Sequence, residues 1–275
     1  MSTQTLTAGT GLPAAGATTA HRVPALLRHS LVLAQRSLVR TFRTPEALID
    51  VTIQPAIFLV LFTYVFGGAI AGGSQHDYLQ FLLPGILGQT IALGGVAIGV
   101  NLNEDVGKGI FDRFRALPIG RSAPLIGAVL ADVVRYTLVF VTTLVMGYLL
   151  GFRAETGVLS VAAGGLLAVG FALCLSWMSV WVGMKARTSG AVQGIMMLLL
   201  LPLSFASATF VPSATMPGWL QTFADNNPLT HLVNAERALL LGQPMGDHLW
   251  QTGAWMVGLV AVFFPLALRA YRRRV

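Results

Sequence analysis

The lysines of the sequence are the first residues to test for chemistry, because a loop that binds nucleotide phosphates needs one. Such a loop has the form G-x-x-x-x-G-K-[ST], in which backbone amides and the lysine hold the phosphates. Lys108 has Leu102 where the first glycine belongs and Gly109 where the serine or threonine belongs. The other lysine, Lys185, follows Met184 instead of a glycine. The sequence therefore contains no nucleotide-binding loop of this kind.

Patterns for catalysis and metal binding are equally missing. Zinc sites need clustered histidines, but the histidines of this chain are far apart: His21, His29, His76, His231 and His248. A nucleophile of the G-x-S-x-G form is not found around the serines of the apolar stretches: Ser160, Ser176, Ser189 and Ser204. The single cysteine, Cys174, allows no disulfide and no cysteine metal site. We predict no catalytic residue, no metal and no cofactor in this chain.

Asp132 and Arg135 are the best-placed charged pair within an apolar stretch, at i and i+3 on one helix face. Charges in such stretches are candidates for function, but this pair lies near one end, where an ion pair that supports the next loop is the simpler role. Ion-coupled carriers place ionisable groups near the bilayer midplane, and the centres of the stretches hold no acid. An ion-coupled carrier or channel therefore stays only as the alternative, and an integral membrane enzyme is weaker still.

The composition indicates that the solvent of this chain is lipid. Only 11% of its 275 residues are charged and 55% are hydrophobic, whereas soluble domains carry about 25% charged residues. The apolar residues form continuous runs of about twenty, the length that crosses a bilayer as a helix. We therefore expect an all-α polytopic membrane protein, and a water-soluble enzyme is excluded.

Six stretches are apolar enough to be transmembrane helices, near residues 51–70, 82–100, 124–150, 158–184, 190–211 and 252–269. Fifteen of the eighteen Lys and Arg residues fall in the segments on one side of these spans, and only Arg153 and Arg237 fall in the segments on the other. Because cytoplasmic loops are rich in basic residues, we expect both termini in the cytoplasm. The net charge of +7 then reflects topology, and it does not indicate nucleic-acid binding.

Two segments precede the first span. Residues 1–23 are mostly small and polar and predict a flexible cytoplasmic tail. Residues 24–43 predict an amphipathic helix, with Leu31 and Leu38 on one face and Arg40 on the opposite face. This pattern fits an interfacial helix on the anionic inner leaflet; a soluble helix docked on another subunit is the alternative.

The cytoplasmic loop after the second span predicts a short charged helix over residues 104–117. Val106, Ile110 and Phe114 recur at helical spacing, and Pro118 ends the pattern. An aromatic face of this kind needs something to bury it. A partner subunit would do so, and an interfacial helix on the lipid headgroups is the alternative.

The longest outer segment, residues 210–251, is too rich in Pro and Asn for a further span. Pro228 can begin a helix, so we expect an external cap of short or re-entrant helices before the last span. Trp219 and Trp250 would lie at the outer membrane interface, where tryptophan is common.

Four features, in this order, resemble the membrane subunit of type-2 ABC exporters, and in particular antibiotic-resistance permeases of the daunorubicin type. They are the basic amphipathic helix, the loop N-E-D-V-G-K-G-I-F-D-R-F-R-A-L-P-I-G-R, the outer stretch F-V-P-S-A-T-M-P-G-W-L-Q followed by N-N-P-L-T-H-L-V-N-A-E-R, and six spans with a basic tail. The resemblance covers residues 24–275 and implies one type-2 ABC transmembrane domain.

The resemblance also implies partners. It implies two permease chains, identical or paralogous, and two copies of an ATP-binding subunit, which would hold ATP and Mg while this chain holds no cofactor and is no enzyme. The loop helix becomes the coupling helix, with these residues toward the ATPase: Glu104, Asp105, Lys108, Ile110, Phe111, Arg113, Phe114 and Arg115. The assembly would lie in a bacterial inner membrane and would export an apolar or amphipathic substrate, such as an antibiotic or a lipid-like molecule.

In the implied dimer, the second and fifth spans of both chains face the dimer axis. The residues expected to line the substrate path are Gln89, Thr90, Met196, Met197, Ser204 and Ser207. Methionine suits varied ligands because its side chain adapts to their shape, although each of these residues could instead serve helix packing.

Overall fold

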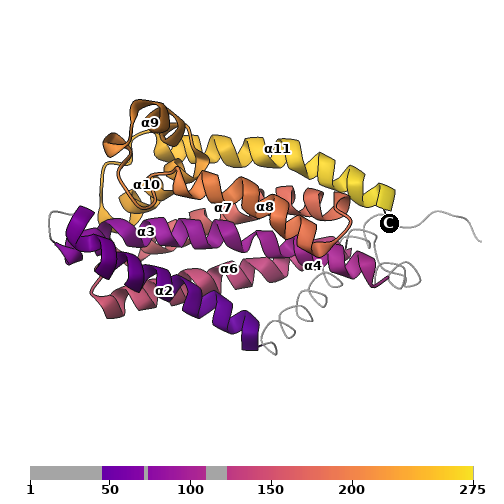
Figure 1. Ribbon diagram of the computed structural model, residues 1–275, viewed down its shortest axis with the longest axis horizontal. Helices are drawn as coiled ribbons and strands as arrows, with labels where there is room; N and C mark the ends of the chain where they lie inside the picture. The colour runs from indigo at the N-terminus through magenta and orange to yellow at the C-terminus, as the bar shows by residue number, and fades with distance from the viewer. Residues whose placement is uncertain (1–44, 71–73, 110–122, 275) are drawn as a thin grey trace, which may run out of the picture.

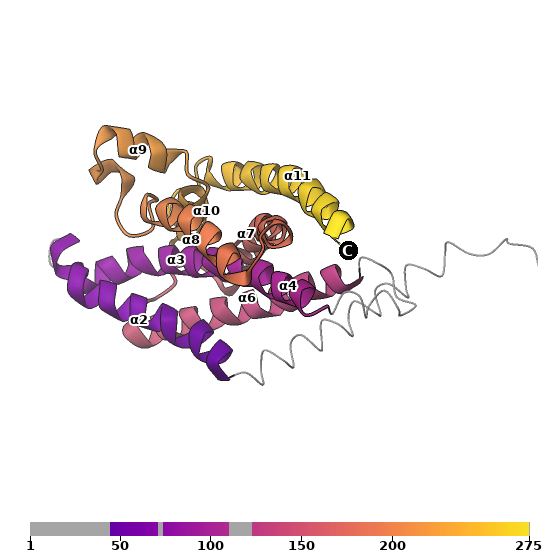
Figure 2. The same cartoon turned by 45° about the vertical axis from the view of Figure 1, so that its right-hand side comes forward.

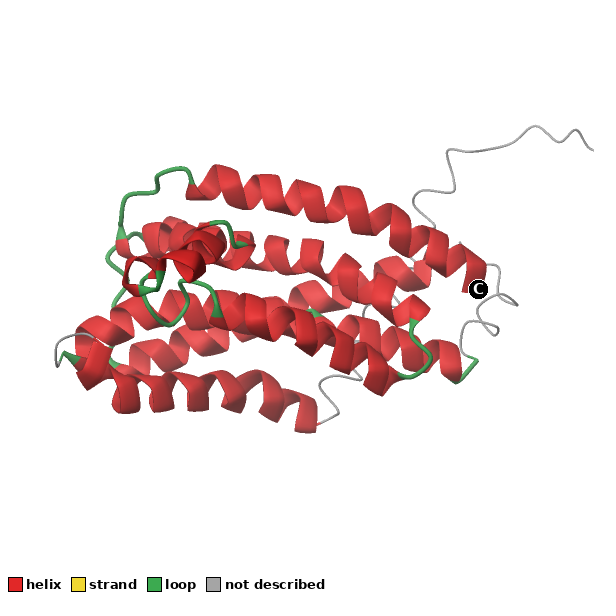
Figure 3. Ribbon diagram, turned by 45° about the horizontal axis from the view of Figure 1, so that its top comes forward, coloured by secondary structure: helices red, strands yellow, loops and turns green. Residues whose placement is uncertain are grey.

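The computed structural model describes residues 45–70, 74–109 and 123–274, and within these ranges the secondary structure is helical (Figure 3). The expected tail over 1–23 and the interfacial helix over 24–43 lie outside the described residues. The helices, in chain order, are α2 (Pro45–Ile70), α3 (Gln75–Gly94), α4 (Val96–Gly107), α6 (Ala123–Leu150), α7 (Val158–Lys185), α8 (Ser189–Phe205), the 3-10 turn η1 (Ser213–Thr215), α9 (Gly218–Asp225), α10 (Pro228–Leu241) and α11 (His248–Arg274).

The long helices run side by side along the length of the molecule (Figure 1). Helix α7 is the central one, since it contacts α3, α4, α6, α8, α10 and α11 (Figure 2). Its buried face carries small residues such as Gly164, Gly165 and Ala168, which let neighbouring helices approach closely, as is common between helices in membranes.

Four described segments are long and apolar enough to cross a membrane: Gln75–Gly107, Asp132–Leu150, Val158–Lys185 and His248–Arg274. Two shorter apolar helices, Ile53–Gly67 and Ser189–Phe205, correspond to the first and fifth expected spans. Only 11% of the apolar window of His248–Arg274 is buried, so most of that surface needs lipid or another chain around it. The all-helical membrane fold is therefore confirmed, while the count of six spans stays a prediction.

Two expected boundaries differ from the structure. The second stretch, expected near 82–100, is part of a longer run in which α3 begins at Gln75 and α4 ends at Gly107, with a break at Gly95. The fifth, expected to reach residue 211, ends at Phe205 as helix α8. The hydropathy pattern placed the end of this stretch too late, because the residues that follow Phe205 are still apolar or small although the helix has ended.

The outer segment does hold short helices. The turn η1 and helix α9 precede α10, which begins with Pro228 as its first residue, as the sequence indicated. These elements lie at one end of the molecule, and the end of α4 and the C-terminus lie at the opposite end (Figure 1). Whether the first of these ends faces the outside of a cell stays a prediction.

Candidate functional site

The end of α4 carries the described part of the expected coupling segment. Glu104 and Asp105 belong to the last turn of α4 and do not start a separate helix. Lys108 caps this helix, and its Nζ lies 2.9 Å from Glu104 Oε2 in an exposed ion pair. The remaining coupling candidates lie outside the described residues: Ile110, Phe111, Arg113, Phe114 and Arg115.

Helix α4 is fixed to the end of α7 by polar side chains that reach backbone carbonyls. Asn103 Nδ2 donates to the carbonyls of Gly183 (2.8 Å) and Ala186 (2.9 Å). Arg274, near the end of α11, donates through Nη1 to Met184 (2.7 Å) and Ala186 (2.9 Å). These carbonyls are left unsatisfied where α7 ends, so one set of hydrogen bonds joins α4, α7 and α11 into a single block.

The same three-helix block contains a close helix crossing. A side chain at Gly99 of α4 would collide with the backbone of Ser179, and one at Gly183 of α7 would collide with the backbone of Gly99. Only glycine permits this approach. Helices α4 and α7 therefore meet here through direct backbone contact.

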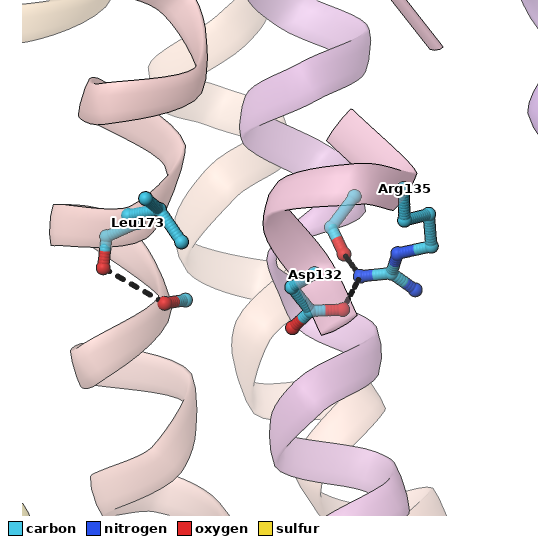
Figure 4. A network of polar contacts seen from close by, with 5 residues as sticks. Asp132, Arg135 and Leu173 are labelled. Carbon is cyan, nitrogen blue, oxygen red and sulfur yellow. Dashed lines mark hydrogen bonds and ion pairs between the residues drawn. The ribbon is translucent and has the colours of Figure 1, made fainter. Parts of the chain in front are cut away.

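Helices α3 and α4 are separated by a break that a charged pair from α6 supports (Figure 4). The amide of Gly95 bonds to the carbonyl of Ala92 at 3.2 Å, one residue short of the helical spacing. The carbonyl of Gly94 accepts a hydrogen bond of 2.7 Å from Arg135 Nη2, which also lies 2.9 Å from Asp132 Oδ1. The pair therefore stabilises the break at Gly94 and Gly95, where α3 ends and α4 begins.

This placement refines the role that the sequence suggested for the pair. Both side chains are largely buried between helices, with 16% of Arg135 and 12% of Asp132 exposed, so other helices of this chain enclose the pair. Asp132 Oδ2 and the hydroxyl of Tyr136 are buried and have no hydrogen-bond partner among the described residues. Figure 4 labels Leu173 of α7, whose carbonyl accepts a hydrogen bond of 2.8 Å from the hydroxyl of Ser176 in the same helix.

The expected substrate-path residues divide into two groups. Those that are buried inside this chain are Gln89, Met196, Ser204 and Ser207; Thr90 and Met197 are half-buried. Met196 packs in an apolar cluster with residues of α4 and α7, and the Ser207 hydroxyl donates to the Ser204 carbonyl at 2.6 Å. Within a single chain, the first group therefore contributes to packing, and the second group lies closer to the surface.

Helices α2 and α8 are among those with apolar faces that the described residues do not cover. On α2 the exposed residues include Ile57, Tyr64 and Val65, and on α8 they include Leu198 and Phe205. Among the described residues, no atom lies near the space that a side chain at Gly190 or Gly194 of α8 would occupy. Such faces need lipid or another protein chain against them.

Asn227 connects the end of α8 to the start of α10, a role that the sequence analysis did not predict. Its Oδ1 accepts from the amide of Leu229 at 2.9 Å and so caps the start of α10. Its Nδ2 donates to the carbonyls of Leu203 (2.6 Å) and Ala206 (3.2 Å) at the end of α8. One side chain thus satisfies both helix ends and sets the angle between α8 and α10.

Arg237, which the sequence places in the expected outer segment, is 3% exposed. Its guanidinium donates to the carbonyls of Phe81 (3.1 Å) and Ala208 (2.8 Å) and to Asn234 Oδ1 (2.9 Å), and it lies 3.6 Å from the centre of the Phe81 ring. The acceptors are mostly backbone carbonyls, which leave no signature in a sequence. The sequence signal that could have indicated burial of Arg237 was the Glu236-Arg237 pair among the apolar residues of a predicted helix.

His231 on α10 meets His248 at the start of α11, with 3.5 Å between the two Nδ1 atoms. Burial and the neighbouring His248 lower the pKa of His231, and Asp225 opposes this shift only in part. The contact between the two rings therefore joins α10 to the start of α11. No group of three or more metal-ligating side chains is found among the residues that the structure describes.

With this geometry in place, comparison with known proteins identifies the class. Residues 28–241 match the family described as the ABC-2 type transporter, and the chain belongs to that family. It is the membrane permease subunit of an ABC transporter, a subunit without a nucleotide site of its own, and it works with an ATP-binding subunit.

Individual relatives cover most of the chain. It is 43% identical over 242 residues to the daunorubicin resistance ABC transporter permease protein DrrB1 of Streptomyces coeruleorubidus. The aligned region covers 87% of this chain and 84% of that relative. The chain is 27% identical over 248 residues to the probable doxorubicin resistance ABC transporter permease protein DrrC of Mycobacterium tuberculosis (89% and 88%). It is also 26% identical over 213 residues to the doxorubicin resistance permease DrrB of the same species (74% of each).

Proposed function

We propose that this chain exports apolar or amphipathic small molecules of the antibiotic or drug type from a bacterial cell. The observation that carries the proposal is the 43% identity, over most of both chains, to a permease named for daunorubicin resistance. The chemistry of the chain supports it. The centres of the expected spans hold no acid, so a path along them suits an uncharged or amphipathic cargo better than an inorganic ion.

The transporter works as a dimer of this chain, or of this chain and a paralogue, with two ATP-binding subunits that hold ATP and Mg. The uncovered apolar faces of α2 and α8 support a second permease chain, because an exposed strip of small and apolar residues is what a neighbouring helix packs against. The substrate path follows this interface. Thr90 and Met197 line it, and Gln89, Met196, Ser204 and Ser207 hold the lining helices in place from behind.

Energy enters at the segment 104–117. The ATP-binding subunit docks there, on Glu104, Asp105 and Lys108 at the end of α4 and on the aromatic residues that follow. Movement then passes along α4, across the Gly99–Gly183 crossing, to α7 and α11. The domain spans residues 24–275, and both of its termini face the cytoplasm. The supporting observation is that the end of α4 and the C-terminus lie at the same end of the molecule.

The test is transport in inside-out vesicles that contain this chain and the ATP-binding subunit encoded beside it. We expect accumulation of doxorubicin that needs ATP, stops when the ATPase is inactivated, and survives a proton ionophore. Vesicles with the ATPase alone are the control. Uptake that persists without the ATPase and collapses with the proton gradient would instead support an ion-coupled carrier.

A further inference from the structure

Glu236 on α10 is a buried acid that no step of the proposed transport cycle uses. It is 0% exposed, and neither of its carboxyl oxygens has a hydrogen-bond partner of good geometry. It faces α3 at Gly88, where the space that a side chain would fill is already occupied by Val233, Leu232 and Glu236 Oε2 of α10. The carboxyl is therefore enclosed between the backbone of one helix and the apolar residues of another.

The neighbouring Arg237 does not neutralise this acid through a hydrogen bond. Consecutive residues on a helix point about 100° apart, and the Arg237 guanidinium is directed to other acceptors. Its Nη2 donates to the Ala208 and Thr209 carbonyls, its Nε to Phe81, and its Nη1 to Asn234. Backbone dipoles and the Phe81 ring thus stabilise the cation, and the acid is left without an ion pair in contact.

Other ionisable groups around α10 are few. On α3 there is Tyr78, whose hydroxyl donates to the carbonyl of Phe210 at 3.2 Å. The contact with α11 holds His231 and His248, and Asp225 at the end of α9 acts on His231. The ionisable residues of α7 are Cys174 and Lys185. The charge nearest to Glu236 along the chain is therefore Arg237.

An ionised carboxylate in such a place loses its hydration without compensation. Burial raises the pKa of Glu236 well above its ordinary value, and this effect outweighs the lowering by Arg237 and by the Gly88 backbone. Arg237 stays cationic at neutral pH, because burial lowers its pKa only to about 9. Burial therefore favours the protonated form of the Glu236 carboxyl beside a cationic Arg237.

We propose that Glu236 is a proton-binding site that links the packing of α10 against α3 to pH. The carboxyl binds a proton when α10 is seated on α3, as it is here. When α10 moves away from α3 and water reaches the carboxyl, the proton is released and the carboxylate forms. This site is not the energy source of transport, which remains ATP.

The raised pKa of Glu236 determines how the packing of α10 against α3 depends on pH. A group whose pKa is raised in the seated state stabilises that state at low pH, and the contribution is lost as pH rises through the raised value. Acid therefore favours the seated conformation and alkali favours separation. If the export function proposed above is right, α10 is part of the outer end of the path, and external pH sets how readily that end opens.

The first test measures thermal unfolding and infrared absorption of the purified chain in nanodiscs, from mildly acidic to mildly alkaline pH. Wild type should lose stability as pH rises, with loss of a protonated-carboxyl band over the same range. Glu236→Gln keeps the shape and neutrality of the bound form, so the band and the pH dependence should both be missing. Glu155→Gln, which removes an exposed acid close to the end of α10, should behave as wild type.

A second variant guards against a folding defect. Glu236→Met replaces the acid by an apolar side chain of similar length, and it should be as stable at alkaline pH as wild type is at acidic pH. A pH dependence that persists in both Glu236 variants, or a wild type without a Glu236-dependent band, would overturn the proposal. Doxorubicin transport is measured in a separate experiment. If the Glu236 carboxyl titrates but the chain does not transport, the result contradicts the proposed export function and still supports the proton-binding site.

Discussion

At the scale of single residues, the end of the molecule that holds α9 and α10 depends on a few polar side chains that reach backbone carbonyls. Asn227 joins the end of α8 to the start of α10, and Arg237 joins α10 to α3 and to the turn after α8. Each side chain satisfies groups that would otherwise be buried without partners, which is costly in a protein interior. These residues therefore hold the short helices in place as much as apolar packing does.

Replacing Asn227 by alanine should lower the free energy of unfolding by about 2 to 4 kcal/mol. About 1 kcal/mol comes from the lost helix cap, and the rest comes from the carbonyls of Leu203 and Ala206, which lose their donor. Denaturant unfolding in detergent micelles measures this change. Asn226→Ala is the matched control, since Asn226 is exposed and bonds only to Thr222, and it should cost less than about 0.5 kcal/mol.

The position of Asn227 was visible in the sequence, but its role was not. Asn-Pro before an apolar run predicts a helix start, and α10 does begin there. Its second set of bonds, to the end of α8, depends on how two helices meet, and no local pattern encodes that. The same holds for Arg237, which counted as an outer charge until its backbone acceptors were seen.

At the scale of elements, the sequence predicted where helices lie better than where they end. Continuous apolar runs indicated α2, α6, α7 and α11 directly. Helix α8 ended early because the residues after Phe205 bond locally, the Ser207 hydroxyl meeting the Ser204 carbonyl and Thr209 Oγ1, and short polar side chains of this kind compete with helix hydrogen bonds. Hydropathy averages over a window and does not detect such bonds.

The crossing of α4 and α7 gives a prediction at this scale. Gly99→Ala should destabilise the chain by about 1 to 3 kcal/mol, because the new methyl group meets the backbone of Ser179 and one of the helices must shift. ATP hydrolysis should then be poorly coupled to transport. Unfolding of the purified variant and the ratio of doxorubicin moved to ATP consumed measure the two effects.

Gly194→Ala is the control for that prediction. No atom in the described part of the chain lies near the place of its added methyl group, and alanine is the better helix former, so the stability of the isolated chain should be unchanged or slightly higher. Should Gly99→Ala leave both stability and coupling at the wild-type level, α4 and α7 do not move as one block.

At the scale of the whole molecule, the proposed function places energy input at one end of the chain and cargo release at the other. The end of α4 and the C-terminus lie together, and α9 lies at the opposite end (Figure 1). The break between α3 and α4, supported by Asp132 and Arg135, separates α4, which ends at the proposed docking segment, from α3, which packs against α10. Membership of the ABC-2 type transporter family supplies the partner that this arrangement requires.

The central claim, that a separate ATPase acts on the segment after α4, is tested most directly by ATP hydrolysis of the reconstituted complex. The measurement compares wild type, a Phe111→Ala and Phe114→Ala double variant, and Phe223→Ala, which removes an exposed aromatic residue from α9. We predict that the double variant loses drug-stimulated hydrolysis by about tenfold or more, as expected when anchoring aromatic residues leave an interface, while Phe223→Ala matches wild type. A double variant with full stimulated hydrolysis and full complex formation would contradict the account.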